Sequence, residues 1–239
     1  MTIALIGDLH GNMPAVEALD KDLKRRKIDT VYCLGDLVGK GPSNAETMDW
    51  ALERCQVNLR GNWDEGVGMK QFPNDTFYHR QLGEKRLKIL AELPLEHHFT
   101  LSGRKIRLLH GRPVMDEPYF IHESTKDLEK YFEPDWDVVG YADVHRQGLR
   151  VIAFRGILFN TGSVGNGLGV NMVQYAIMDG GDSPDDPLDI RLVTLPYDRE
   201  KAVRLTLEAE KQGLRNAQAF INEIRTGVYD RPSSGRHPY

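Results

Sequence analysis

The sequence contains little cysteine, no long apolar run and little excess charge. Its only cysteines, Cys33 and Cys55, lie in or beside apolar stretches, where we expect buried reduced thiols. No apolar stretch approaches the roughly 18–20 residues that a membrane helix needs, and no basic and apolar leader is visible. A net charge of −4 gives no basis for stable nucleic-acid binding. We therefore expect a cytoplasmic protein that binds neither membranes nor nucleic acids.

The residue pattern predicts one domain over residues 1–230 and a flexible polar tail over 231–239. In the first half, apolar runs alternate with segments of helical spacing, as in stacked βαβ units; the helices are expected at 13–27, 43–54 and 78–92. The second half is rich in strands, with hairpins at 98–111 and 149–162, further strands at 136–145, 171–178 and 188–195, and a helix near 125–133. Two last helices begin near Asp198 and Arg215.

Several apolar runs end in a glycine that is followed, or closely accompanied, by a side chain able to bind a metal. These side chains are Asp8, His10, Asp36, Asn62, Asp64, His110, Asp143 and His145. Ligands of open α/β sheets gather at the carboxyl ends of strands, so five such ends define one predicted site. The turn after a strand lets Asp8 and His10 face the same point, which is why both could bind one metal ion.

The order of these motifs resembles that of the calcineurin-like metallophosphoesterase superfamily. The stretches "DLHGN", "YCLGDLVGKGP", "LRGNWDEG" and "FNTGSVGN" are similar to the branch of bacterial small phosphodiesterases. "GNWDE" is also similar to the streptococcal-type asymmetric diadenosine tetraphosphate hydrolases, in which tryptophan replaces a histidine. The fold that this resemblance implies is α/β (α+β), a four-layer αββα sandwich.

The resemblance also implies a metal centre with two divalent ions. Asp8, His10 and His145 would hold the first ion and Asp36 would bridge both, while Asn62, His110 and Asp143 would complete the second site. Carboxylate and imidazole ligands suit Mn, Fe, Zn or Mg, and the sequence does not choose among them. Two such ions would clamp a phosphoryl group and supply a bridging hydroxide for in-line attack.

Two positions depart from the family's pattern. Asp143, in "ADVH", stands where a metal-binding histidine is usual, and it is either a substituted ligand or a bystander in a degraded site. Trp63 replaces a histidine near the leaving group, and an indole has no titratable proton near pH 7. Asp64, the catalytic-site carboxylate that orients that histidine in the family, loses its usual partner. Substrates whose leaving group departs as a stable anion should therefore be favoured.

The resemblance indicates a two-metal phosphodiesterase or dinucleoside polyphosphate hydrolase, and we expect its small phosphorylated substrate to be a nucleotide. A phosphoprotein phosphatase and a non-hydrolytic metal- or nucleotide-binding protein are the alternatives. Trp63 either stacks on a nucleobase or packs beside the site. Four cationic residues next to the motifs either contact phosphate oxygens or form solvated or structural ion pairs: Lys40, Arg60, Arg112 and Arg146.

Overall fold

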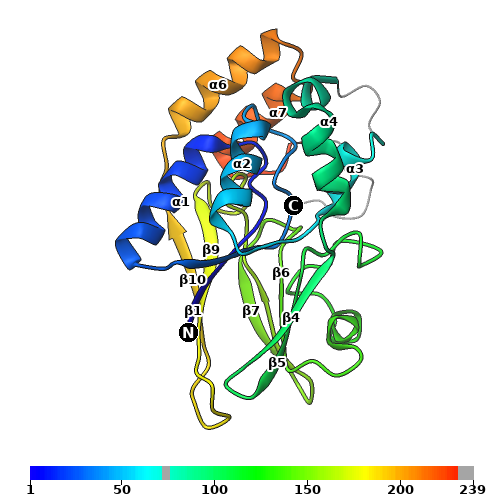
Figure 1. The fold of residues 1–239 in the computed structure, drawn as a ribbon, viewed down its shortest axis with the longest axis vertical. Helices are drawn as coiled ribbons and strands as arrows, with labels where there is room; N and C mark the ends of the chain where they lie inside the picture. Colours follow the sequence, from blue (N-terminus) through cyan, green and yellow to red (C-terminus); the bar gives the residue numbers. More distant parts are fainter. Residues whose placement is uncertain (72–75, 231–239) are drawn as a thin grey trace.

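Two five-stranded sheets form the centre of the protein, with helices gathered mainly on the first (Figure 1). The computed structural model describes residues 1–71 and 76–230, so the predicted tail at 231–239 lies outside the described residues. The first sheet has the order β10-β9-β1-β2-β3 and the second β4-β5-β6-β8-β7. The strands are β1 (Thr2–Ile6), β2 (Thr30–Cys33), β3 (Val57–Asn58), β4 (Glu96–Leu101), β5 (Arg104–Leu109), β6 (Val138–Tyr141), β7 (Gly148–Ile152), β8 (Gly156–Asn160), β9 (Val173–Asp179) and β10 (Asp189–Leu195).

The helices largely follow the predicted ranges. They are α1 (Met13–Arg26), α2 (Asn44–Arg54), α3 (Asn62–Gly68), α4 (Thr76–Glu92), α5 (Thr125–Leu128), the 3-10 turn η1 (Glu129–Phe132), α6 (Arg199–Lys211) and α7 (Ala217–Thr226). The sequence did not predict α3, because "NWDEGVG" is short, has no apolar periodicity and contains two glycines. None of the helices in the described ranges is long and apolar enough to cross a membrane.

The first sheet combines parallel βαβ units with an antiparallel return. β1, β2 and β3 are parallel, as the alternation of apolar runs and helices predicted. β9 pairs antiparallel with β1 and brings β10 to the edge of the same sheet. Strands from the second half of the chain therefore complete a sheet begun by the first half.

Apolar side chains fill three layers between the elements. Along β1, Ile3 and Leu5 lie in the core between the two sheets, whereas Ala4 and Ile6 lie in the core beneath the helices. This double burial explains why β1 reads as an unbroken apolar run. A third core covers the outer face of the second sheet and includes residues of α5 and η1. The four-layer αββα fold is thus confirmed, with a fourth layer that contains only these short helical segments.

Candidate metal centre

The carboxyl ends of strands from both sheets converge on one buried point. Asp8 and His10 follow β1, Asp36 follows β2 and Asn62 begins α3, while His110 follows β5. Glycines allow these ends to approach: Gly35 has a φ of +110°, and a Cβ there would lie 2.9 Å from His110 Nδ1. A Cβ at Gly61 would overlap the carboxylate of Asp36. The glycines before the polar side chains are therefore required by packing at this point.

Two groups of potential ligands share one aspartate. Asp8, His10 and His145 form the first group, and Asp8, Asp36 and His110 form the second; within each, the ligand atoms lie within 4.8 Å of one another. Asp36 Oδ2 lies 3.5 Å from His10 Nε2 and 3.4 Å from His110 Nε2, so it stands between the groups. Asn62 Oδ1 lies 3.2 Å from His110 Nε2 and adds an amide oxygen beside the second group.

Backbone carbonyls orient all three imidazoles. His10 Nδ1 lies 3.1 Å from the carbonyl oxygen of Val38, and His110 Nδ1 lies 2.9 Å from that of Leu34. His145 Nδ1 lies 2.8 Å from the carbonyl oxygen of Asn166. When Nδ1–H donates to a carbonyl, Nε2 carries the free lone pair, which is the arrangement of histidines that bind metals.

The donor atoms at the centre are arranged as for a bound cation rather than for a hydrogen-bonded protein interior. Neither carboxylate oxygen of Asp8 has a hydrogen-bond partner among the described residues, although the side chain is fully buried. His10 Nε2 lies 3.1 Å from His145 Nε2, and His145 Nε2 lies 3.2 Å from Asp8 Oδ1. Lone pairs that face one another at these distances repel unless a positive charge lies between them.

Burial and mutual charge shift the pKa values of the group strongly. Burial and the charge of Lys40 lower the pKa of His10 to about 3. Burial alone would also lower the pKa of His110, but the carboxylates of Asp36 and Asp8 outweigh it and raise this pKa to about 10. Burial would raise the pKa of Asp8, yet the neighbouring histidines lower it well below its usual value. Near neutral pH, Asp8 and Asp36 are therefore ionised and His110 carries a positive charge.

Backbone strain is concentrated at this centre. Six of the eleven described non-glycine residues with positive φ belong to it or adjoin it: Asp8, His10, Asp36, Lys40, Asp143 and His145, with φ between 46° and 68°. Such conformations cost roughly 1–3 kcal/mol each and cluster at functional sites. The strain is consistent with side chains held in place for binding rather than for folding stability.

Asp64 supports the loop that carries Asp36. Its fully buried carboxylate accepts hydrogen bonds from the backbone N–H groups of Asp36 at 2.7 Å, Leu37 at 2.9 Å and Gly61 at 3.0 Å. We expected a catalytic-site residue without its usual histidine partner, and the structure gives it backbone donors as partners. These contacts make Asp64 a positioning residue for Asp36, and a direct role in the reaction stays a prediction.

Trp63 packs beside the first ligand group. Its half-buried ring meets the ring of His10 edge-on, with centroids 6.0 Å apart, and meets Tyr78 in the same way at 6.1 Å. A Cβ at Gly39 would overlap the indole, so this glycine admits the ring. Of the two interpretations of Trp63, these contacts support packing; stacking on a nucleobase stays a prediction.

Asp143 is engaged by Arg112 and belongs to neither ligand group. The guanidinium of Arg112 grips the carboxylate through Nη2 at 2.6 Å and Nε at 2.9 Å, and the backbone N–H of Arg112 adds a bond of 3.1 Å. The two residues follow β5 and β6, next to His110 and His145. The geometry therefore favours Asp143 as the anchor of Arg112 over the substituted metal ligand that we expected.

The other predicted cations have different surroundings. Lys40 is buried and its Nζ lies 3.2 Å from His145 Nε2, at the centre. Arg60 donates to the carbonyl of Ala91 and lies 3.7 Å from a carboxylate oxygen of Glu65, contacts that give it a structural role. The guanidinium of Arg146 lies 5.9 Å from the centroid of the Phe120 ring. Phosphate contacts by Arg60 and Arg146 stay predictions.

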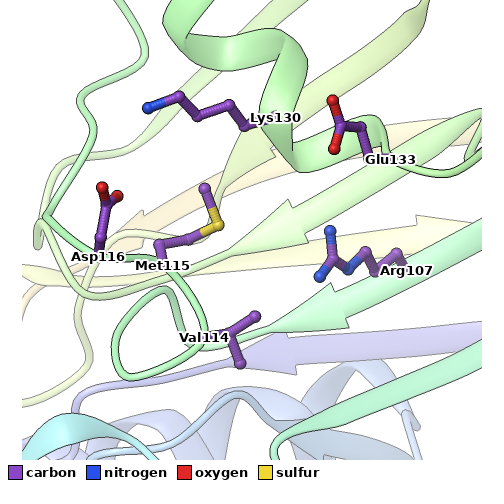
Figure 2. A pocket seen from close by; sticks show the side chains of 6 residues that line it. All are labelled: Arg107, Val114, Met115, Asp116, Lys130 and Glu133. Atoms are coloured by element: carbon purple, nitrogen blue, oxygen red, sulfur yellow. The ribbon is translucent and has the colours of Figure 1, made fainter.

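A pocket of about 420 Å³ on the outer face of the second sheet contains none of the candidate ligands (Figure 2). Arg107, Lys130 and Glu133 line it together with three residues of the loop after β5. Arg107 pairs with Glu96 at 2.6 Å and Lys130 donates to Tyr119 Oη at 2.6 Å. Because these cations are held by the protein itself, we assign the pocket no ligand.

Asn166 belongs to the centre but was not predicted. Its carbonyl oxygen orients His145, and its backbone N–H donates to Ser163 Oγ at 2.9 Å. Ser163 Oγ in turn donates to the carbonyl of Asp8 at 3.0 Å. The signal was the stretch "FNTGSVGN", which indicated a turn but carried no side chain typical of catalysis.

Comparisons with known proteins agree with this geometry. Residues 1–183 match the model of the calcineurin-like phosphoesterase superfamily domain. An uncharacterized protein of Methanocaldococcus jannaschii is 28% identical over 224 residues, which cover 84% of this chain and 89% of that protein. The crystal structure of a metallophosphoesterase from Sphaerobacter thermophilus is similar with a TM-score of 0.75 at 20% identity, over 95% of this chain and 100% of that one. The crystal structure of a hypothetical protein from Pyrococcus horikoshii is similar with a TM-score of 0.75 at 18% identity, over 97% of this chain and 99% of that one.

If Asp64 acts by holding the Asp36 loop, Asp64→Asn should lower the free energy of unfolding even without metal. The amide would turn hydrogen-bond donors toward backbone N–H groups, and each unsatisfied buried donor costs about 1–3 kcal/mol. Urea unfolding in a chelator measures this loss, and the exposed Asp185→Asn should stay within about 0.5 kcal/mol of the parent. An Asp64→Asn protein as stable as the parent, yet inactive, would instead make Asp64 a participant in the reaction.

If Asp143 anchors Arg112, Asp143→Ala should leave the number of bound metal ions unchanged but weaken the binding of inorganic phosphate. The guanidinium would lose its fixed direction while keeping its charge. Calorimetric titration with Mn²⁺ and then with phosphate separates the two effects, and Arg112→Lys should weaken phosphate binding in the same way. Loss of one metal ion from Asp143→Ala would restore Asp143 as a ligand of the second site.

Proposed function

Because this chain belongs to the calcineurin-like phosphoesterase superfamily and is a metal-dependent phosphoester hydrolase, we propose that it is a two-metal phosphodiesterase that cleaves nucleotide-like substrates. Dinucleoside polyphosphates of the diadenosine tetraphosphate type are the substrates that we propose first. The expected superfamily is confirmed by the match over residues 1–183. The number and identity of the metals and the choice of substrate belong to the proposal.

The observation that carries the proposal is the pair of ligand groups that share Asp8, with Asp36 between them. Two divalent cations held at such a centre would clamp a phosphoryl group and lower the pKa of water, which would make a hydroxide nucleophile available near neutral pH. The protein's contribution is to hold the carboxylates and imidazoles in place before substrate arrives. The backbone contacts of the three histidines and of Asp64 support that role.

Two cationic side chains beside the ligand groups support the binding of phosphate oxygens. Lys40 lies against His145 of the first group, and Arg112 follows His110 of the second. Asp143 occupies Nε and Nη2 of Arg112, so the guanidinium is fixed while its remaining edge is available for a second anion. The side chain of Arg112 is 37% exposed, which leaves it open to a ligand from solvent. Together these side chains favour a substrate with more than one phosphate group.

The residue at position 63 favours leaving groups that need no proton. The indole of Trp63 lies beside His10, where it cannot act as a general acid near pH 7. A nucleotide phosphate departs from a phosphoanhydride as a stable anion, whereas an alkoxide requires protonation. This difference supports a phosphoanhydride or an activated diester over an alkyl phosphomonoester.

The activity should depend on added metal, and the rate of cleavage should differ among the substrates. We expect the chelated protein to be inactive, Mn²⁺ to restore it, and diadenosine tetraphosphate and bis(p-nitrophenyl) phosphate to be cleaved faster than p-nitrophenyl phosphate or a phosphopeptide. Faster cleavage of the phosphopeptide would favour a phosphoprotein phosphatase. Metal binding without turnover of any of the four substrates would favour a non-hydrolytic binding protein.

Asp36→Asn should reduce both metal affinity and activity more than Asn62→Ala does. Asp36 contacts histidines of both ligand groups, whereas Asn62 lies beside His110 alone. We expect kcat to fall by at least about 100-fold in Asp36→Asn, since a carboxylate that lies between the two ion sites acts on both. Metal analysis after desalting and steady-state kinetics in Mn²⁺ measure the two effects. Near-parent activity of Asp36→Asn would contradict a shared ligand at this position.

Trp63→His should make the rate less dependent on the leaving group. With aryl phosphodiesters of graded basicity, the parent should lose rate steeply as the leaving group becomes more basic, because nothing protonates it. A histidine at position 63 adds a titratable group worth about 10²–10⁴-fold for basic leaving groups. Trp63→Phe is the matched control and should keep the parent's slope. Equal slopes for all three proteins would show that position 63 does not control protonation.

A further inference from the structure

The C-terminal helix α7 lies outside the residues that match the superfamily and yet reaches the centre. Glu223 of α7 is fully buried, and its Oε2 accepts a hydrogen bond of 2.9 Å from Asn166 Nδ2. The carbonyl of Asn166 in turn accepts from His145 Nδ1 at 2.8 Å. A carboxylate on α7 is thus two hydrogen bonds away from a ligand of the first group.

Asn166 lies in a segment that has little regular structure of its own. No helix or strand is assigned between β8 and β9, that is, from residue 161 to 172. This segment holds both Asp8 and His145. Ser163 Oγ and the N–H of Gly165 donate to the carbonyl of Asp8, and the carbonyl of Asn166 accepts from His145 Nδ1. A displacement of Asn166 would therefore disturb Asp8 as well as His145.

Further contacts attach α7 to the loops of the centre. Phe220 is fully buried, and a Cβ at Gly41, next to Lys40, would lie 2.9 Å from its Cε1. The N–H of Gly169 donates to the carbonyl of Gly227, just after α7, at 2.9 Å. The helix is therefore packed on both loops that flank the first ligand group.

A buried carboxylate is energetically unfavourable if its only role is to hold a helix in place. Removing an ionised group from water costs several kcal/mol unless hydrogen bonds offset it, and an apolar side chain would pack there at no such cost. Glu223 accepts hydrogen bonds from the amide of Asn166 at 2.9 Å and from the backbone N–H of Asp230 at 3.3 Å. The first of these donors belongs to the residue that orients His145.

We infer that Glu223 is a positioning residue for the first metal site: through Asn166 it fixes the ring of His145, so the C-terminal helices complete a centre that residues 1–183 do not complete alone. The inference rests on the proposed function, since it takes His145 as a metal ligand. Partners of metal-binding residues typically change metal affinity by about 10–100-fold when they are removed. We expect a loss of about tenfold, because Glu223 acts through one intervening residue.

The test is calorimetric titration of the full chain with Mn²⁺ and the free energy of unfolding in a chelator, for three variants on α7. Glu223→Leu removes the acceptor and should weaken one of the two metal-binding events about tenfold while leaving the other unchanged. Glu223→Gln keeps an acceptor oxygen for Asn166 and should stay within about threefold of the parent. Ile224→Ala creates a cavity at the buried neighbour and should lower stability without changing either affinity.

A double-mutant cycle with Asn166→Ala separates positioning from general stabilisation. If Glu223 acts through Asn166, each single variant should lose about tenfold in metal affinity and the double variant should lose little more. If Glu223→Leu does not fold, Glu223→Ala takes its place in the cycle with Asn166→Ala, and the same outcome is expected. Parent-like metal binding by either Glu223→Leu or Asn166→Ala would overturn the inference, as would equal weakening of both metal-binding events. A parent protein that binds no metal would instead overturn the proposed function on which the inference rests.

Discussion

The mutual repulsion of buried lone pairs and carboxylates around Asp8 is the constraint on which this structure depends. Two aspartates that are at most 1% exposed and the Nε2 atoms of three imidazoles point at one small volume. Hydrogen bonds from the described residues do not satisfy the oxygens of Asp8. A cation would convert the same repulsion into a strong attraction, because charges interact strongly where water is excluded. The superfamily's chemistry needs such cations, so the repulsion that destabilises the metal-free protein serves cation binding.

Much of the surrounding structure holds this unfavourable arrangement together. The first sheet supplies Asp8 and Asp36 from adjacent parallel strands, and the second supplies His110 and His145. Backbone carbonyls fix the rings, while the carboxylate of Asp64 fixes the loop after β2. The left-handed backbone at the ligands is tolerated because these supports determine it from several directions.

The fold and the convergence of the candidate ligands were predictable from the sequence because they leave local signals. β1 is an unbroken apolar run that ends in Gly7, and the spacing of Asp8 and His10 marks the turn after it. Gly35 and Gly61 are local signals because packing requires glycine there. A Cβ at Gly35 would meet His110 and the backbone of Gly61, and a Cβ at Gly61 would meet Asp36. By contrast, "NWDEGVG" carries no periodic signal, and the first residues of α3 form hydrogen bonds with the Asp36 loop.

The partners of the charged residues could not be predicted, because they depend on contacts between distant segments. The sequence left open whether Arg112 faces a phosphate or forms an ion pair, and whether Asp143 binds a metal. The two residues lie 31 positions apart in the chain and bind each other. Glu223 lies 57 residues from Asn166, and nothing in the sequence around either residue points to the other. Such pairs are fixed by how the strands and helices pack, which residue patterns within one segment do not encode.

The most direct test of the two-metal centre is a crystal structure of the protein soaked in Mn²⁺, with anomalous difference density measured at the manganese absorption edge. The account predicts two peaks about 3.5–4 Å apart. One should lie among Asp8, His10 and His145, and the other among Asp36, Asn62 and His110. A single peak, or peaks that avoid these residues, would contradict it.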